Sequence, residues 1–260
     1  MSRLQQAFSE AKAEGRGALI IYLCAGDPSL AATRDIVWAI EEAGADLVEL
    51  GVPYSDPVAD GPTIQAAAKR ALKGGARVAG VLECVAQIRE RSQIPLVIMS
   101  SVSPLFRFGL DRFATEAAAA GLDGVLLADL PPEESGEWRE LAEANHLSTV
   151  FLVSPATPPA RIKLAADATT GFVYAVSRAG VTGARTELPP QLPEMIARIR
   201  EVTDKPVAVG FGVSTHDHVR SVWQVADGAI VGSAVVKVIA EAGENPAPAA
   251  AAFVRSLRGG

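Results

Sequence analysis

The sequence predicts an α/β protein built as a closed (β/α)8 barrel, and three observations lead to this fold class. Eight short apolar runs recur along the 260 residues. Stretches with helical periodicity separate these runs, so strand and helix alternate to the end of the chain. The runs are almost continuously apolar, which is typical of parallel strands buried on both faces.

The eight runs are the predicted strands of the barrel. They comprise residues 18–23, 47–50, 95–100, 124–128, 149–153, 172–176, 207–211 and 228–232. The clearest helical stretches between them cover residues 33–45, 110–121 and 132–145. Two extra helices add to the eight units, one at the N-terminus (3–14) and one before the third strand (77–91). We expect residues 244–260 to end in a short helix that frays.

The chain is expected to form one domain over residues 1–260. No linker rich in Gly, Pro or Ser divides it, and a barrel of this type typically takes ~250 residues. The alternative is an open, doubly wound sheet. Its dinucleotide-binding form carries G-x-G-x-x-G after the first strand, whereas this chain continues with CAGDPS (24–29). The unbroken rhythm of eight units favours the barrel.

Composition excludes several classes of function. The formal net charge is −6 and no basic cluster occurs, which argues against a nucleic-acid surface. The two cysteines fit reduced, buried thiols. No apolar run reaches the ~18 residues of a membrane span, and the N-terminus lacks the apolar region of a signal peptide. We therefore expect a cytoplasmic protein.

In such a barrel the chemistry is expected where strands end and the following loops begin. The stretch VELGVPYSDPVADGP (48–62) follows the second strand. Leu47, Glu49 and Gly51 share one face of that strand. If this face points inward, Glu49 loses water at the barrel mouth, and its raised pKa suits proton transfer. A strand-end Glu paired with a surface Lys or Arg is an equally good interpretation.

Asp60 is the second candidate acid in this stretch. It could instead cap the next helix, but Pro62 suits the first helical position, which makes Gly61 the cap. Pro53 and Pro57 further restrict the backbone of the loop. The segment is therefore expected to hold two acids, Glu49 and Asp60, in a fixed arrangement.

Glycines follow the last three strands. Residues 177–190 contain Thr182 and Gly183 in a polar segment that suits a lid or a binding loop, or else a disordered connection. GFGVST (210–215) and GSAVV (232–236) follow the seventh and eighth strands, where glycines and a helix N-terminus commonly bind phosphate. Tight packing at the barrel corners is the alternative. His146 precedes the fifth strand, and His216 and His218 begin a helix two residues apart, so they diverge. Without a His at the mouth, we expect no metal site.

Several motifs now resemble one family, the tryptophan synthase alpha subunit, over almost the whole chain. The matching segments are AGDPS (25–29), ELGVPYSDPVADGPTIQ (49–65), ADLPPEE (128–134), SRAGVTGA (177–184), GFG (210–212) and GSAVVK (232–237). The resemblance implies a TIM barrel, that is a (β/α)8 barrel, and a lyase that cleaves indole-3-glycerol phosphate to indole and glyceraldehyde 3-phosphate. It also implies a pyridoxal-phosphate beta subunit as partner in an α2β2 heterotetramer, with no cofactor in this chain.

The resemblance assigns roles residue by residue. The catalytic acids match Glu49 and Asp60. The phosphate-binding positions match Gly183, Gly212, Gly232 and Ser233. The positions around the indole ring and the lid match Tyr22, Ile64, Tyr174, Thr182 and Phe211. Arg178 and Asp129 also match positions of the family motifs.

One segment departs from the family pattern. After the third strand the family tends to carry Met-x-Tyr-x-Asn-Pro, whereas this chain has Ser101 and Ser103 at the Tyr and Asn positions. Communication with the beta subunit, and the fit to indole, are therefore in question. Three alternatives stay open: a lyase that acts without a partner, a phosphosugar isomerase, and a non-catalytic activator of a beta subunit.

Overall fold

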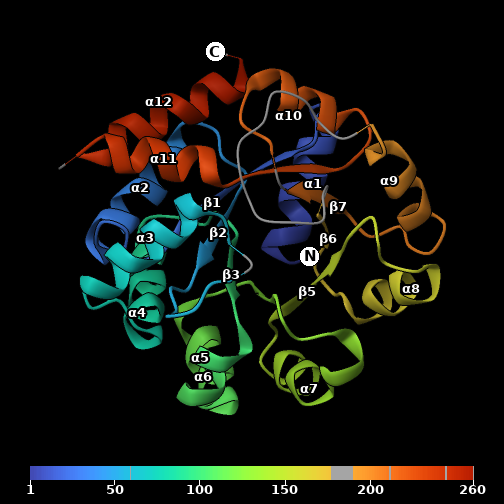
Figure 1. The fold of residues 1–260 in the computed structure, drawn as a ribbon, viewed down its shortest axis with the longest axis horizontal. Coiled ribbons are helices and arrows are strands. Elements are labelled where there is room, and N and C mark those ends of the chain that lie inside the picture. Colours follow the sequence, from blue (N-terminus) through green and yellow to red (C-terminus); the bar gives the residue numbers. More distant parts are fainter. Residues whose placement is uncertain (59, 177–189, 211, 244, 260) are drawn as a thin grey trace.

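A computed structural model describes residues 1–58, 60–176, 190–210, 212–243 and 245–259. Its eight strands are parallel and close into a barrel in the order β1 to β8, as Figure 1 shows. The strands are β1 (Ala18–Cys24), β2 (Leu47–Gly51), β3 (Leu96–Ser100), β4 (Gly124–Leu127), β5 (Ser148–Val153), β6 (Val173–Val176), β7 (Val207–Gly210) and β8 (Gly228–Val231). The predicted fold class is confirmed, and each predicted strand boundary within the described residues agrees to within one residue.

Helices surround the barrel (Figure 1). They are α1 (Arg3–Ala13), α2 (Leu30–Glu42), α3 (Pro62–Lys73), α4 (Val78–Arg89), α5 (Val102–Phe108), α6 (Leu110–Ala120), the 3-10 turn η1 (Pro132–Glu134), α7 (Gly136–Ala144), α8 (Pro159–Ala168), α9 (Leu192–Arg200), α10 (His216–Trp223), α11 (Ser233–Glu241) and α12 (Pro246–Arg258). The two extra helices, α1 and α4, were predicted. Helix α5 was not; the Ser101 hydroxyl caps it by accepting a hydrogen bond from the Ser103 backbone N–H.

The C-terminal segment forms a helix, as expected, but the expectation that it frays was wrong. Helix α12 has 13 residues and packs against α2 and α11 (Figure 1). Its Ala250, Val254 and Leu257 are fully buried. Arg258, at its end, donates hydrogen bonds to the Gly44 carbonyl and to Asp46. Burial of this apolar face offsets the entropy of ordering the segment.

The N-terminal helix covers one end of the barrel interior. Inward side chains of successive strands, among them Ile20, Leu47 and Val97, form an apolar cluster with the N-terminal helix. Leu4 and Phe8 of α1 belong to the same cluster, so α1 closes the end at which the strands begin. We call the opposite end, at which the strands finish and the strand-to-helix loops begin, the mouth.

Carboxylates fasten the closed end of the barrel. Asp46, Asp123 and Asp227 each precede a strand and accept a hydrogen bond from a backbone N–H at or near the start of another strand, those of Leu19, Leu96 and Val207 respectively. Each also pairs with arginine: Arg16 and Arg258, Arg3 and Arg89, and Arg200. These charges at the closed end are structural, as expected for the end of a barrel opposite its loops.

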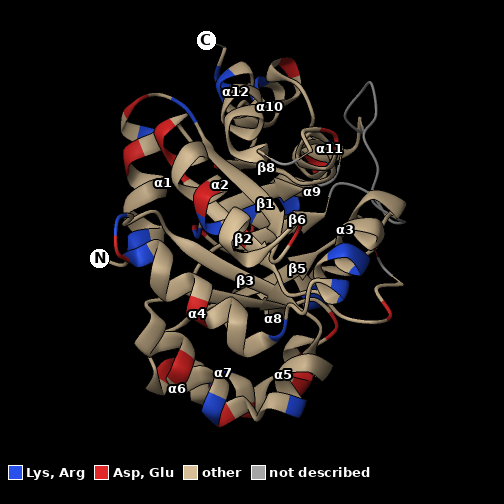
Figure 2. Ribbon diagram, turned by 90° about the vertical axis from the view of Figure 1, so that its left-hand side faces the viewer, with Lys and Arg blue, Asp and Glu red and all other residues tan. Residues whose placement is uncertain are grey.

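Charged residues otherwise lie mainly on helices and loops (Figure 2). Among the residues of the eight strands, Glu49 is the one with a charged side chain. Within the described ranges, no helix is long and apolar enough to cross a membrane.

Candidate active site

Glu49 lies on the inward face of β2, above Leu47. Side chains alternate along a strand, and Leu47 belongs to the apolar cluster inside the barrel. Glu49 is 2% exposed, and neither carboxyl oxygen makes a hydrogen bond to any residue that the structure describes. The alternative of a surface ion pair is therefore wrong. An unpartnered buried carboxyl is costly and indicates a group that is kept for a ligand.

The surroundings of Glu49 favour its protonated form. Burial raises the pKa of Glu49 to about 8, and the negative charge of Asp60 adds to this rise. At neutral pH the group therefore carries a proton that it can give away, and it can take one back near its pKa.

Asp60 stands in the loop between β2 and α3. Gly61 is the N-cap of α3 and Pro62 its first residue, as predicted, so the Asp60 carboxylate is not the cap. Burial raises the pKa of Asp60 to about 6, below the value for Glu49. At neutral pH the two acids thus differ in protonation: Glu49 is mainly neutral and Asp60 mainly ionised.

Two tyrosines lie over strand-end glycines at the mouth. A Cβ at Gly51 would overlap the Tyr22 hydroxyl, and a Cβ at Gly210 would overlap the Tyr174 hydroxyl. Tyr174 is buried and Tyr22 is partly buried. Loss of water raises the pKa of both phenol groups well above the usual value, with Glu49 and Asp60 contributing. Glycine at these positions makes room for aromatic rings close to both acids.

A cavity at the mouth is lined by seven of the predicted residues, among them Asp60 but not Glu49, and by three others. Its lining comprises Tyr22, Asp60, Ile64, Met99, Tyr174, Gly212, Val213, Ile230, Gly232 and Ser233. The apolar members can enclose a flat aromatic ring, while Asp60 supplies a hydrogen-bond acceptor at the rim.

The glycine end of this cavity suits an anion. Gly212 has φ +87° and open space beside it, a conformation that favours glycine. Gly232 is the N-cap of α11 and Ser233 its first residue. The N–H groups of a first helical turn have no partner within the helix, and they favour a negative charge. The cavity therefore combines an apolar part with an anion-binding end.

Not every predicted residue can be placed. Arg178, Thr182, Gly183 and Phe211 lie outside the described residues. The prediction missed Met99, Val213 and Ile230. Met99 pairs in register with Gly51, so the alternation of β3 against β2 would have indicated it.

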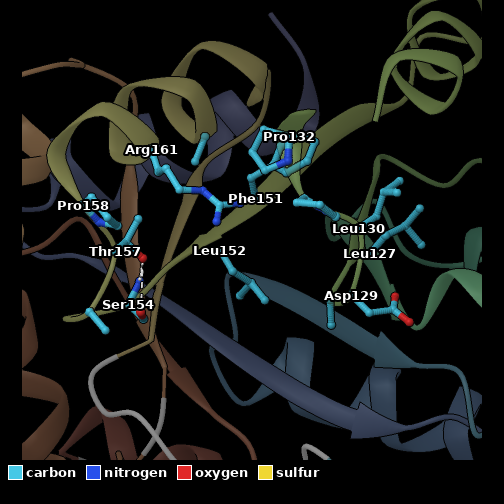
Figure 3. Close-up of a pocket in the computed structure, with 14 residues that line it drawn as sticks. Leu127, Asp129, Leu130, Pro132, Phe151, Leu152, Ser154, Thr157, Pro158 and Arg161 are labelled. Atoms are coloured by element: carbon cyan, nitrogen blue, oxygen red, sulfur yellow. Dashed lines mark hydrogen bonds between the residues drawn. The ribbon is translucent and has the colours of Figure 1, made fainter. Parts of the chain in front are cut away.

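A second cavity, of about 350 Å³, lies between η1, β5 and α8 (Figure 3). Arg161 extends from α8 across it toward Phe151 (Figure 3). Neither Glu49 nor Asp60 lines it, so the paired acids and this cavity are separate features.

Asp129, at the edge of this second cavity, directs its carboxylate away from it (Figure 3). The carboxylate accepts hydrogen bonds from the Ser101 hydroxyl at 2.5 Å and from the Val102 N–H at 2.7 Å. Ser101, one of the two residues at which the sequence departs from the family pattern, thus joins the rim after β3 to the rim after β4.

The fold and the site define the class: a (β/α)8-barrel enzyme with paired carboxyl groups beside an apolar, anion-accepting pocket. Among the described residues no group of three His, Cys, Asp or Glu could hold a metal ion. The family model described as "Tryptophan synthase alpha chain" matches residues 8–258. The chain belongs to this family.

Individual relatives agree over almost their whole length. The tryptophan synthase alpha chain of Geobacter sulfurreducens is 46% identical over 263 residues, with 99% of this chain and 98% of that protein covered. A structure of Mycobacterium tuberculosis tryptophan synthase has a TM-score of 0.92 at 41% identity, covering 99% of this chain and 97% of the other. The Pyrococcus furiosus tryptophan synthase α2β2 complex gives a TM-score of 0.89 at 43% identity, covering 94% and 98%.

Proposed function

We propose that this chain is the alpha subunit of a tryptophan synthase, with Glu49 and Asp60 as its catalytic residues. The reaction is the retro-aldol cleavage of indole-3-glycerol phosphate to indole and glyceraldehyde 3-phosphate. The observation that carries the proposal is the buried Glu49 carboxyl, unpartnered among the described residues and next to the more acidic Asp60.

The first half of the reaction is a proton transfer to the ring. Neutral Glu49 donates its proton to C3 of the indole, and positive charge develops on the ring nitrogen. The ionised Asp60 accepts the hydrogen bond of N1–H, which stabilises this charge as it forms. The difference between the pKa of Glu49 and that of Asp60 supports this division of roles.

The second half breaks the carbon–carbon bond. The Glu49 carboxylate removes the proton from the side-chain hydroxyl next to C3. The carbon that bears this hydroxyl becomes the aldehyde of glyceraldehyde 3-phosphate. The electrons of the broken bond to C3 restore the neutral indole. Glu49 ends protonated, as it began, so no cofactor is consumed.

Binding is divided between the two ends of the mouth cavity. We propose that Gly212, Gly232 and Ser233 hold the phosphate, together with Gly183. The indole ring lies among Tyr22, Ile64, Tyr174 and Phe211, with Thr182 in the lid. Met99 and Ile230, which line the same cavity, complete the apolar wall. Held at both ends, the substrate presents C3 to Glu49.

The partner follows from the family. We propose an α2β2 heterotetramer in which a beta subunit carries pyridoxal phosphate and receives the indole, while this chain has no cofactor. Residues 1–260 act as a single barrel domain in the cytoplasm. The departure at Ser101 and Ser103 favours one second candidate, a lyase that works without a partner.

A direct assay tests the proposal. Indole-3-glycerol phosphate is added to the pure chain with and without a beta subunit, and released indole is measured. We expect release in both cases and faster release with the partner. Glu49→Gln should abolish cleavage with little loss of substrate affinity, because it removes the proton and keeps the shape. Full activity of this variant would reject the assignment of Glu49. Full activity without any response to a beta subunit would favour the partner-free lyase.

A further inference from the structure

The side chain of Gln65 contacts the backbone of the loop that carries Asp60. Its Nε2 lies 2.8 Å from the Asp60 carbonyl oxygen and 3.3 Å from the Pro57 carbonyl oxygen. Gln65 itself stands in the first turn of α3, where its N–H donates to the Gly61 carbonyl at 3.0 Å. One half-buried side chain thus spans from the helix to both ends of the segment 57–60.

The chemistry of the partners fixes the orientation of the amide. Both partners are carbonyl oxygens, which only accept hydrogen bonds. The NH2 group must therefore face them, since the Gln65 oxygen in the same place would repel both. An isosteric carboxylate could not replace this amide.

The other hydrogen bonds described for the loop 53–60 lie within the loop itself. Within it, the Val58 N–H donates to Asp56 O at 2.9 Å and the Asp60 N–H donates to Pro57 O at 3.0 Å. In the described part of the chain, the hydrogen bonds that side chains make to residues 53–60 all come from Gln65. The internal turn gives the loop a shape, and Gln65 connects that shape to a helix packed on the barrel.

We propose that Gln65 is a positioning residue that holds Asp60 at the rim of the pocket; this inference rests on the proposed function. Gln65 donates a hydrogen bond to the backbone carbonyl of Asp60. This bond fixes the position from which the Asp60 carboxylate reaches the indole N1–H. The cleavage depends on that distance more than binding does, because the charge on the ring nitrogen exists only after C3 is protonated. Loss of Gln65 should therefore lower kcat and leave KM nearly unchanged.

The test uses Gln65→Met, which keeps the length of the side chain and removes the donor. Gln65→Glu keeps the shape but places a carboxylate against the two carbonyl oxygens. With the chain bound to a beta subunit, each variant should lose about tenfold in kcat for indole release, as expected when a neutral hydrogen bond that orients a catalytic group is lost. Circular dichroism and thermal unfolding verify that each variant is folded.

Gln87→Met on α4 is the matched control. Gln87 is also half-buried, and its side chain makes no hydrogen bond to any residue within the described ranges. This variant should match the unsubstituted chain in kcat and KM.

A second background separates positioning from general support of the fold. If Gln65 acts through Asp60, Gln65→Met should cost almost nothing in a chain that already carries Asp60→Asn. An equal loss in both backgrounds, or an unchanged kcat in the Gln65→Met chain, would overturn the inference. Failure of the unsubstituted chain to release indole would instead reject the proposed function, and the inference with it.

Discussion

Replacing Glu49 by Gln should change the pH dependence of stability, independently of any activity. The pKa of Glu49 is raised from 4.5 to about 8 in the folded chain, mainly by burial. As pH rises between these two values, the unfolded chain releases the proton and the folded chain retains it. The folded state is therefore increasingly disfavoured as pH rises through this window. The amide that Glu49→Gln introduces cannot ionise, so the substitution removes this dependence.

The magnitude follows from the two pKa values. One pKa unit corresponds to ~1.4 kcal/mol, so a carboxyl raised from 4.5 to about 8 destabilises the folded chain by ~5 kcal/mol once pH is well above the higher value. Most of this develops between about pH 5 and pH 9. The free energy of unfolding of the Glu49→Gln chain, relative to the unsubstituted chain, should grow by ~4 kcal/mol over that range.

Urea unfolding of the isolated chain, followed by circular dichroism at intervals from about pH 5 to pH 9, measures this difference. Glu83, which is exposed on α4, provides the control: Glu83→Gln should give a difference that stays flat. A flat curve for Glu49→Gln as well would refute the reasoning. It would mean that Glu49 is already ionised near neutral pH in the folded chain and has no proton to donate to indole.

Three further outcomes are expected. Asp60→Asn should lower kcat for indole release by about a hundredfold or more, because a neutral amide stabilises the charged ring poorly; near-normal kcat would exclude Asp60 from catalysis. Gly51→Ala should reduce stability by ~1–3 kcal/mol in thermal unfolding, since the added methyl overlaps the Tyr22 hydroxyl, and adding Tyr22→Ala should relieve the overlap. Ser103→Asn should raise severalfold the ratio of the indole release rates with and without a beta subunit. An unchanged ratio would show that Ser103 does not weaken activation by the beta subunit.

The barrel could be predicted because parallel strands buried on both faces leave a strong pattern in the sequence. The eight runs appear as near-continuous apolar segments, and side chains that must be dry on both faces cannot alternate with polar ones. The helices were less visible. Helix α5 begins within SSVSP (100–104), a composition typical of a loop, and it depends on its Ser101 cap. The α12 tail is rich in Ala and Pro, and its order comes from packing against α2, which its own sequence does not reveal.

The site could be predicted in part. Position at a strand end indicated Glu49, and Pro62 correctly indicated that Asp60 is not a cap. Position alone left the burial of Glu49 undecided. Successive side chains of a strand face opposite sides, and the sequence does not say which side faces the barrel interior. The contacts of Gly51 with Tyr22 and of Gly210 with Tyr174 depend on which side chain reaches which neighbouring strand. This follows from the closed barrel and not from the sequence pattern.

The contrast between the carboxyl groups of the barrel explains how one fold serves stability and chemistry at once. Asp46, Asp123 and Asp227 at the closed end each have an arginine partner and a backbone N–H. Their negative charge is compensated, and it ties neighbouring strands together. Glu49 at the mouth has neither kind of partner among the described residues, so its negative charge is costly and burial raises the pKa of its carboxyl to about 8. An arginine placed beside Glu49 would compensate its charge as the aspartates are compensated, would lower its pKa, and would thereby remove the proton that the proposed mechanism uses.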